Sequence, residues 1–186
     1  MKFGEEHGMQ QAATRTLSDA DIAVPIEDRF FEDYTAGAVY EYGHVTVTEA
    51  EILDFARVFD PQPIHVDQEI AAQGPFQGLI ASGWHTGGIM MRLFVDHFLS
   101  RVAGLASPGV DELRWPTPVR PGDSLRLRVT IVEARRSRSK PDRGLVRTHA
   151  ELINQNDEVV LQLTAMNLVR ARHPPNRHDH FHYPSG

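Results

Sequence analysis

The 186-residue chain contains no cysteine, which excludes disulfide bonds, zinc–thiolate sites and a cysteine nucleophile. It also lacks any run of the roughly 18–20 apolar residues that a membrane-spanning helix needs. Its first 21 residues are polar and have no apolar centre of the kind found in a signal peptide. We therefore expect a cytoplasmic protein with no membrane contact.

An excess of positive charge is absent as well. The net charge is -6, which argues against nucleic acid as a partner because phosphate binding normally requires a basic surface. The length is typical of one domain with its own core. We expect a flexible N-terminal arm (residues 1–24), one folded domain (25–172) and a disordered tail rich in His and Pro (173–186). Alternating histidines in this tail could chelate a metal, but we regard them as incidental and predict no metal site.

Helix signals are concentrated between residues 48 and 102. Thr48 and Glu51 form a capping box that begins a short amphipathic helix, and Pro61 and Pro63 end it just after Asp60. A second short helix is predicted over residues 67–73. The longest helix should begin near Ser82-Gly83 and run to about residue 102, with a wide apolar stripe that indicates burial on most sides.

Strand signals flank these helices. Residues 38–47 are β-like, and the second half has β-rich or alternating segments at 111–115, 124–132, 145–152 and 159–169. One long helix followed by a series of antiparallel strands indicates an α+β protein whose antiparallel sheet wraps around a central helix.

Asp60 and His65 are the first candidates for chemistry. Two prolines separate them, which rules out a regular helix between them and places a carboxylate and an imidazole on a stiffened loop. The alternative is an ordinary capping or solvated pair. Gly83 follows at the expected start of the long helix, where a backbone N–H can stabilise developing negative charge.

These residues resemble the motifs of the MaoC-like dehydratases, the (R)-specific enoyl-CoA hydratase group of the hotdog fold. The pattern Asp-x-Asn-Pro-x-His falls on Asp60, Gln62, Pro63 and His65, and the pattern Phe-x-x-x-Ile-x-x-Gly falls on Phe76, Ile80 and Gly83. The segment 118–123 resembles the one that precedes the family's long strands. The resemblance covers about residues 30–170 and implies a hotdog fold.

The resemblance also implies a mechanism. Asp60 and His65 would hold one water and share two proton transfers, and the Gly83 N–H would serve as the oxyanion donor. Which of the two side chains is base and which is acid stays open. The substrate would be an acyl-CoA or acyl-carrier thioester, with no cofactor beyond the coenzyme A that the substrate carries. The family usually assembles as a homodimer or a dimer of dimers.

Two residues depart from the pattern. Gln62 stands where the family has Asn, and Ser82 stands where a His often precedes the helix-starting glycine. We predict that the substrate-binding residues are Gln62, Pro63, Ser82, Trp84 and His85. The simpler roles are a loop-bracing amide for Gln62, a helix cap for Ser82 and a hydrogen-bonded pocket or core histidine for His85.

The leading hypothesis is therefore an (R)-specific 2-enoyl-CoA hydratase or acyl-thioester dehydratase. A hotdog thioesterase is one alternative, although the central helix offers only Asp96 as a carboxylate. A non-catalytic acyl-thioester-binding protein is the other. A basic cluster at residues 135–143 could bind coenzyme A phosphates, but a solvated hairpin turn is the preferred interpretation.

Overall fold

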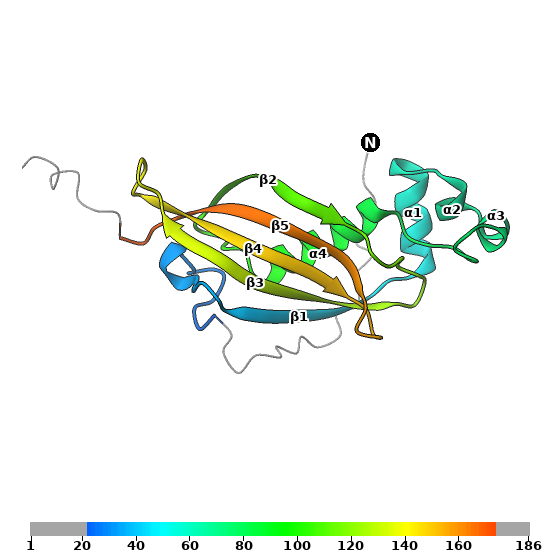
Figure 1. Ribbon diagram of the computed structural model, residues 1–186, viewed down its shortest axis with the longest axis horizontal. Helices are drawn as coiled ribbons and strands as arrows, with labels where there is room; N and C mark the ends of the chain where they lie inside the picture. Colours follow the sequence, from blue (N-terminus) through cyan, green and yellow to red (C-terminus); the bar gives the residue numbers. More distant parts are fainter. Residues whose placement is uncertain (1–21, 174–186) are drawn as a thin grey trace, which may run out of the picture.

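Five antiparallel strands form one sheet in the order β1-β3-β4-β5-β2 (Figure 1). The computed structural model describes residues 22–173. The strands are β1 (Val39–Thr46), β2 (Gly104–Arg114), β3 (Ser124–Arg136), β4 (Arg143–Ile153) and β5 (Val159–Arg170). The helices are η1 (Phe31–Asp33), α1 (Glu49–Phe59), α2 (Pro63–Val66), α3 (Gln68–Gln73) and α4 (Gly83–His97).

Alternating side chains give the sheet one apolar face. In β3 the side chains of Leu125, Leu127, Val129 and Ile131 are fully buried, and the residues between them are partly exposed. A pleated strand sends successive side chains to opposite faces, so this period of two defines the inner face. The same alternation continues in β4, which pairs with β3, and in β5, which pairs with β4.

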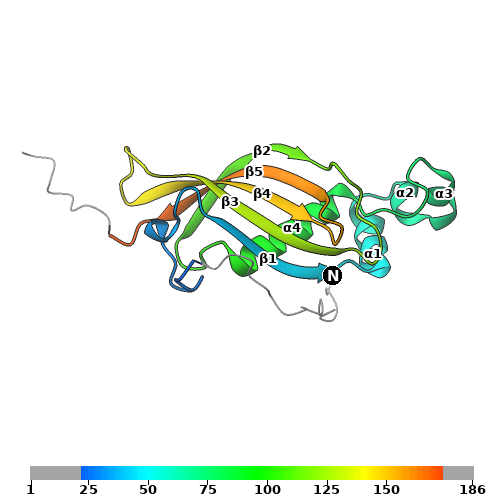
Figure 2. The ribbon, with the colours of Figure 1, turned by 60° about the horizontal axis from the view of Figure 1, so that its bottom comes forward.

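Helix α4 lies against this inner face, and the sheet curves around it (Figure 2). Its buried residues are Thr86, Ile89, Met90, Leu93 and Phe94. The arrangement confirms the predicted sheet wrapped around a central helix. Met91 and Val95 point outward and are substantially exposed, so the prediction of burial on most sides was wrong.

The central helix also ends earlier than predicted, at His97 instead of about residue 102. The buried Arg29 guanidinium donates hydrogen bonds to the carbonyl oxygens of His97 and Phe98, and the Tyr34 hydroxyl donates to the Phe98 carbonyl. These donors come from a segment distant in sequence. They satisfy the last carbonyls of the helix, which allows the chain to turn away into β2.

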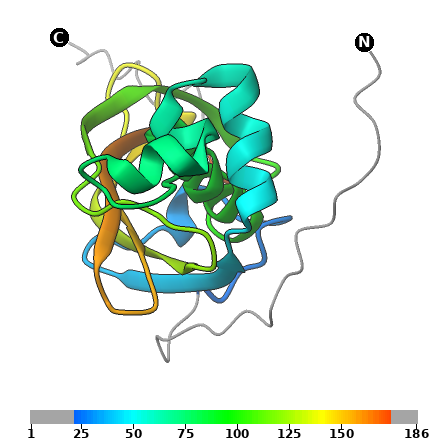
Figure 3. The same ribbon diagram turned by 90° about the vertical axis from the view of Figure 1, so that its right-hand side faces the viewer.

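Helices α1, α2 and α3 lie together over one end of the sheet and of α4 (Figure 3). The predicted capping box is present: the Glu51 N–H donates to Thr48 Oγ1, and the Thr48 N–H donates to the Glu51 carboxylate. The prolines end α1 as predicted. Pro63, however, begins the single helical turn α2, since proline is favoured at the first helical position. His65 therefore lies on a short helix and not on an irregular loop.

Strand β2 is longer than predicted, because it begins at Gly104 and not near Asp111. Ser107, Pro108 and Gly109 obscure this strand in the sequence. An edge strand tolerates such residues because only one of its sides must pair, and β2 pairs with β5 alone, with several shifts of register.

Part of the predicted N-terminal arm belongs to the folded core. Ile22 is buried in the core and Val24 packs against it, although both fall within the expected arm. The rest of the predicted arm, residues 1–21, and nearly all of the predicted tail, including its alternating histidines, lie outside the described residues. No helix among residues 22–173 is long and apolar enough to cross a membrane.

Candidate active site

The carboxylate of Asp60 stands at the end of α1, where Asp60 is the C-cap residue. One oxygen, Oδ2, accepts a hydrogen bond of 2.6 Å from Ser82 Oγ, and the other, Oδ1, accepts one of 2.7 Å from Gln62 Nε2. These hydrogen bonds, that from Ser82 foremost, lower the pKa of Asp60. Asp60 is consequently ionised at neutral pH, and its plane is fixed by two donors.

His65 is buried, with 5% of its surface exposed. Its Nδ1 lies 2.9 Å from the carbonyl oxygen of Ile80. A carbonyl can only accept, so Nδ1 carries a proton and Nε2 is the ring nitrogen left to face Asp60. Nε2 faces Asp60 Oδ2 at 3.5 Å. A water molecule beside the pair could form hydrogen bonds with both atoms.

An apolar pocket of about 280 Å³ adjoins this pair. His65 and Gly83 line it, whereas Asp60 lies beside it, next to His65. The other lining residues are Ile64, Phe76, Ile80, Ala81, Thr86, Trp115, Pro116, Thr117, Pro118, Val119 and Val160. Most are apolar, which suits an acyl chain better than a charged ligand.

Gly83 begins α4, so its N–H has no acceptor within the helix. A Cβ added to Gly83 would lie 2.7 Å from Cε2 of Trp115, closer than real contacts allow. The Trp115 Nε1–H also donates a hydrogen bond of 2.9 Å to the Gly83 carbonyl oxygen. The missing side chain therefore makes room for the indole of Trp115, and the N-terminus of α4 is fixed against the segment that follows β2.

The expected binding residues take different positions. Ser82 caps α4 by accepting from the Trp84 N–H and also donates to Asp60, which gives it a role beyond the cap. Gln62 binds the other oxygen of the same carboxylate. Neither they nor Pro63, Trp84 and His85 are among the residues that line the pocket.

His85 and Trp84 lie on other faces of α4. The His85 ring stacks on Phe55 of α1, with ring centroids 5.0 Å apart. Its Nδ1 is buried without a hydrogen-bond partner among the described residues, and burial lowers the pKa of His85. Trp84 is 62% exposed and meets Trp115 edge-on. Both therefore border the site without facing its cavity.

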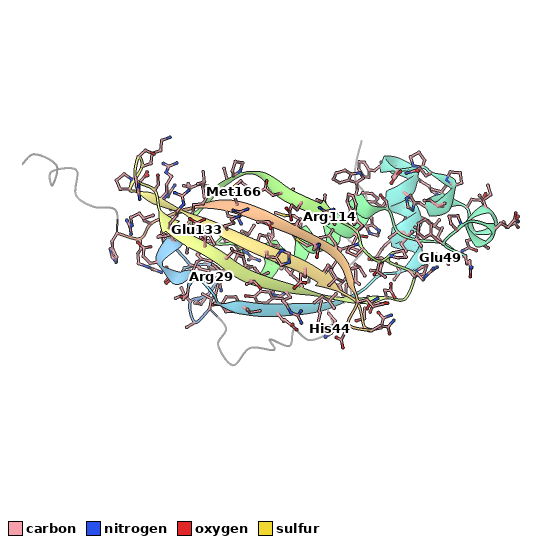
Figure 4. All side chains as sticks on the ribbon, in the orientation of Figure 1. Arg29, His44, Glu49, Arg114, Glu133 and Met166 are labelled. Carbon is pink, nitrogen blue, oxygen red and sulfur yellow. The ribbon has the colours of Figure 1, made fainter. Side chains whose placement is uncertain are left out.

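Two arginines adjoin the pocket and a basic cluster lies far from it: the Arg120 guanidinium donates a hydrogen bond of 2.6 Å to the carbonyl oxygen of the pocket residue Phe76. The basic cluster at residues 135–143 lies around the β3–β4 hairpin, at the opposite end of the molecule from α1–α3 (Figure 1). Arg114 lies at the end of β2, next in sequence to the pocket residue Trp115 (Figure 4). Within residues 22–173 no group of three or more His, Asp or Glu side chains could hold a metal ion.

Trp115 and the Ile80 carbonyl are the parts of the site that sequence reasoning missed. The backbone carbonyl left no signal in the sequence. Trp115 had a weak one, because it lies three residues before the segment 118–123 that resembles the family pattern. Only the fold brings Trp115 onto the N-terminus of α4.

Fold and site together define a hotdog-class protein with an Asp–His pair beside the N-terminus of its central helix. Residues 33–153, more than half of the chain, match the MaoC like domain family. The chain belongs to this family of dehydratase-like proteins.

Three known proteins illustrate the similarity. The crystal structure of a MaoC-like dehydratase from Rhodospirillum rubrum is 41% identical with a TM-score of 0.73, covering 78% of this chain and 99% of that one. The 3-hydroxybutyryl-CoA dehydratase of Methylorubrum extorquens is 30% identical over 74% of this chain and 82% of its own length. The 3-hydroxyacyl-thioester dehydratase Z of Mycobacterium tuberculosis is 38% identical over 47% of this chain, and the match spans 60% of that protein.

Proposed function

We propose that this protein catalyses the reversible, (R)-specific addition of water to 2-enoyl-CoA or to the equivalent carrier-bound thioester. The observation that carries the proposal is the 3.5 Å distance between His65 Nε2 and Asp60 Oδ2 beside an apolar pocket. Each side chain is oriented by a further hydrogen bond, His65 to the Ile80 carbonyl and Asp60 to Ser82. Relatives named as 3-hydroxyacyl-thioester and 3-hydroxybutyryl-CoA dehydratases support the reaction class. The (R) configuration is supported by the resemblance of the motifs to the (R)-hydratases.

In the proposed hydration, a water molecule forms hydrogen bonds with both Asp60 and His65 from the side of the pair. His65 Nε2 takes one proton from the water, since its lone pair is free and its Nδ1–H is fixed on the Ile80 carbonyl. The hydroxide adds to C3, and the electron pair of the C2–C3 double bond moves to the thioester as an enolate. The ionised Asp60 stabilises the imidazolium formed in this step.

The enolate oxygen would accept a hydrogen bond from the Gly83 N–H, where the dipole of α4 favours negative charge. A proton then passes from the Asp60–His65 pair to C2, the thioester carbonyl re-forms, and one molecule of water has been added. Dehydration follows the same steps in reverse. The proposed steps require no metal or redox cofactor.

The test compares the hydration of crotonyl-CoA by wild type, Asp60→Asn and His65→Gln. The reaction is monitored by the loss of the enoyl thioester absorbance. Each substitution should lower kcat by about 100-fold or more, the scale of one lost proton-transfer group. Asp54→Asn and His149→Gln are matched controls, because Asp54 is an exposed carboxylate of α1 and His149 lies on the sheet outside the pocket. Chiral analysis of the product should give the (R) alcohol.

Unchanged turnover in both variants would contradict the mechanism. Tight binding of acyl-CoA without water addition would instead favour the non-catalytic alternative. Release of free thiol from acyl-CoA would favour the thioesterase. Asp96 gives that activity little support: it forms a 2.6 Å ion pair with Arg92 and follows Gly83 by 13 residues, about 20 Å along the helix.

A homodimer is the proposed assembly. Strand β2 is an edge of the sheet, and all but two of its residues are exposed. Three exposed apolar side chains of α4, Trp84, Met91 and Val95, have the spacing of one helix face. Pairing of two copies would cover such an edge. Light scattering at micromolar concentration should give twice the mass of the chain, and a monomer would contradict the proposal. Cytoplasmic location stays a prediction.

A further inference from the structure

Trp115 forms a wall of the apolar pocket. It directly follows β2, and its indole covers the Cα of Gly83 so closely that a Cβ added there would lie 2.7 Å from Cε2 of Trp115. His65, the proposed base, lines the same pocket. The indole thus occupies space next to the proposed reaction centre.

Several contacts hold this indole in one place. Its Nε1–H donates to the Gly83 carbonyl oxygen at 2.9 Å, and its ring meets that of Trp84 edge-on with centroids 5.5 Å apart. Pro116 and Pro118 follow and restrict the backbone of the wall. The hydrogen bond, the ring contact and the restricted backbone together orient the indole, although 41% of the Trp115 surface is exposed.

The pocket is also small. Its volume of about 280 Å³ is just below the range of roughly 300–1,000 Å³ found for small-molecule sites. Trp115 has the largest side chain among the lining residues. A fixed bulky wall in a small apolar pocket limits the size of the acyl group.

We propose that Trp115 is a specificity-determining residue that restricts the protein to short acyl thioesters. The inference rests on the proposed function, because it assumes that the acyl group of the substrate occupies this pocket. Replacement of the indole by a small side chain should enlarge the pocket beside Gly83 and admit longer chains. Trp115→Phe should have a smaller effect, because it keeps an aromatic ring and loses the hydrogen bond to Gly83.

The first experiment compares hydration of crotonyl-CoA and 2-octenoyl-CoA. Trp115→Ala should raise the ratio of kcat/KM for octenoyl over crotonyl thioester by about tenfold or more, since one methylene group in a fitted pocket already changes discrimination by 10-fold to 200-fold. Trp115→Phe should raise it less. Ile70→Ala, which truncates an exposed apolar side chain of α3 outside the pocket, is the matched control and should leave the ratio unchanged.

The second experiment measures binding of butyryl-CoA and octanoyl-CoA by titration calorimetry. These saturated thioesters cannot be hydrated, so the measurement does not depend on turnover. Wild type should prefer the four-carbon chain, and Trp115→Ala should shift the preference toward eight carbons by about the same factor as in the kinetic test. Trp115→Leu replaces Trp115→Ala if the alanine variant does not fold.

The two proposals fail in different ways. In one outcome, wild type hydrates no enoyl-CoA but binds short acyl-CoA, and the Trp115 variants shift this preference. That outcome refutes the proposed activity and supports the role of Trp115. In the other outcome, wild type is active, but the Trp115 variants have the same chain-length ratios as wild type in both kinetics and binding. That outcome overturns the inference about Trp115 and leaves the proposed activity intact. Preference of wild type for the eight-carbon chain also overturns it.

Discussion

Replacement of Ser82 by alanine tests how the site is held together. The Ser82 hydroxyl is fully buried, donates to Asp60 Oδ2 at 2.6 Å and accepts from the Trp84 N–H as the N-cap of α4. A hydrogen bond to a charged group contributes about 1.5–3 kcal/mol, and a helix cap about 1 kcal/mol. We therefore expect Ser82→Ala to lower the free energy of unfolding by about 2.5–4 kcal/mol at neutral pH.

The same change should reduce kcat/KM for crotonyl-CoA by about 10- to 100-fold, because the Asp60 carboxylate loses one of the two donors that orient it. Ser82 is the main cause of the lowered pKa of Asp60, so its loss should raise that pKa toward the ordinary value. The acidic limb of the kcat/KM profile should consequently move to higher pH. Rates are measured from acid to neutral pH, and unfolding by urea at the same pH values.

The stability difference should depend on pH in a defined direction. A carboxyl group whose pKa is lower in the folded state stabilises the protein fully above its unfolded pKa, and this contribution is lost as pH falls through the folded pKa. Ser82→Ala removes part of that contribution. The gap in stability between wild type and variant should thus be largest at neutral pH and shrink in acid toward the effect of the cap alone.

Thr48→Ala is the matched control. Thr48 caps α1 through its contact with the Glu51 N–H, and Asp60 is not among its hydrogen-bond partners. Its loss should cost about 1 kcal/mol of stability and leave both kcat/KM and the acidic limb as in wild type. An unmoved acidic limb in Ser82→Ala, together with kcat/KM within twofold of wild type, would refute the reasoning.

Two further predictions concern packing and the end of α4. Gly83→Ala should destabilise the fold by about 1–3 kcal/mol and lower hydratase activity, because the added Cβ would displace the Trp115 indole. Gly88→Ala should instead stabilise the fold by up to about 1 kcal/mol in the same urea experiment, because an added Cβ there meets no neighbouring atom within 4 Å. Equal stability of the two variants would contradict this. Arg29→Met should lower the urea midpoint by the equivalent of about 3 kcal/mol with an unchanged m-value, because the carbonyls of His97 and Phe98 lose a charged donor. The control Arg101→Met, at an exposed ion pair, should cost under about 1 kcal/mol.

Local signals predicted most of the secondary structure. The capping box at Thr48 and Glu51 and the prolines after Asp60 define α1 through interactions between near neighbours, which sequence reasoning can identify. The alternation in residues 125–131 similarly predicted β3 and its buried face. The predictions were wrong at the end of α4 and the beginning of β2, where Arg29 and the pairing with β5 act from far along the chain.

The candidate site divides in the same way. By itself, the sequence was sufficient to propose Asp60, His65 and Gly83, because their types, spacing and helix-start position are local properties that match a family pattern. Tertiary structure alone decided that Ser82 binds Asp60, that the Ile80 carbonyl fixes the His65 tautomer, and that Trp115 packs on Gly83. These contacts join residues 15 to 32 positions apart, and only the folding of the sheet and α1–α3 around α4 brings such residues within bonding distance.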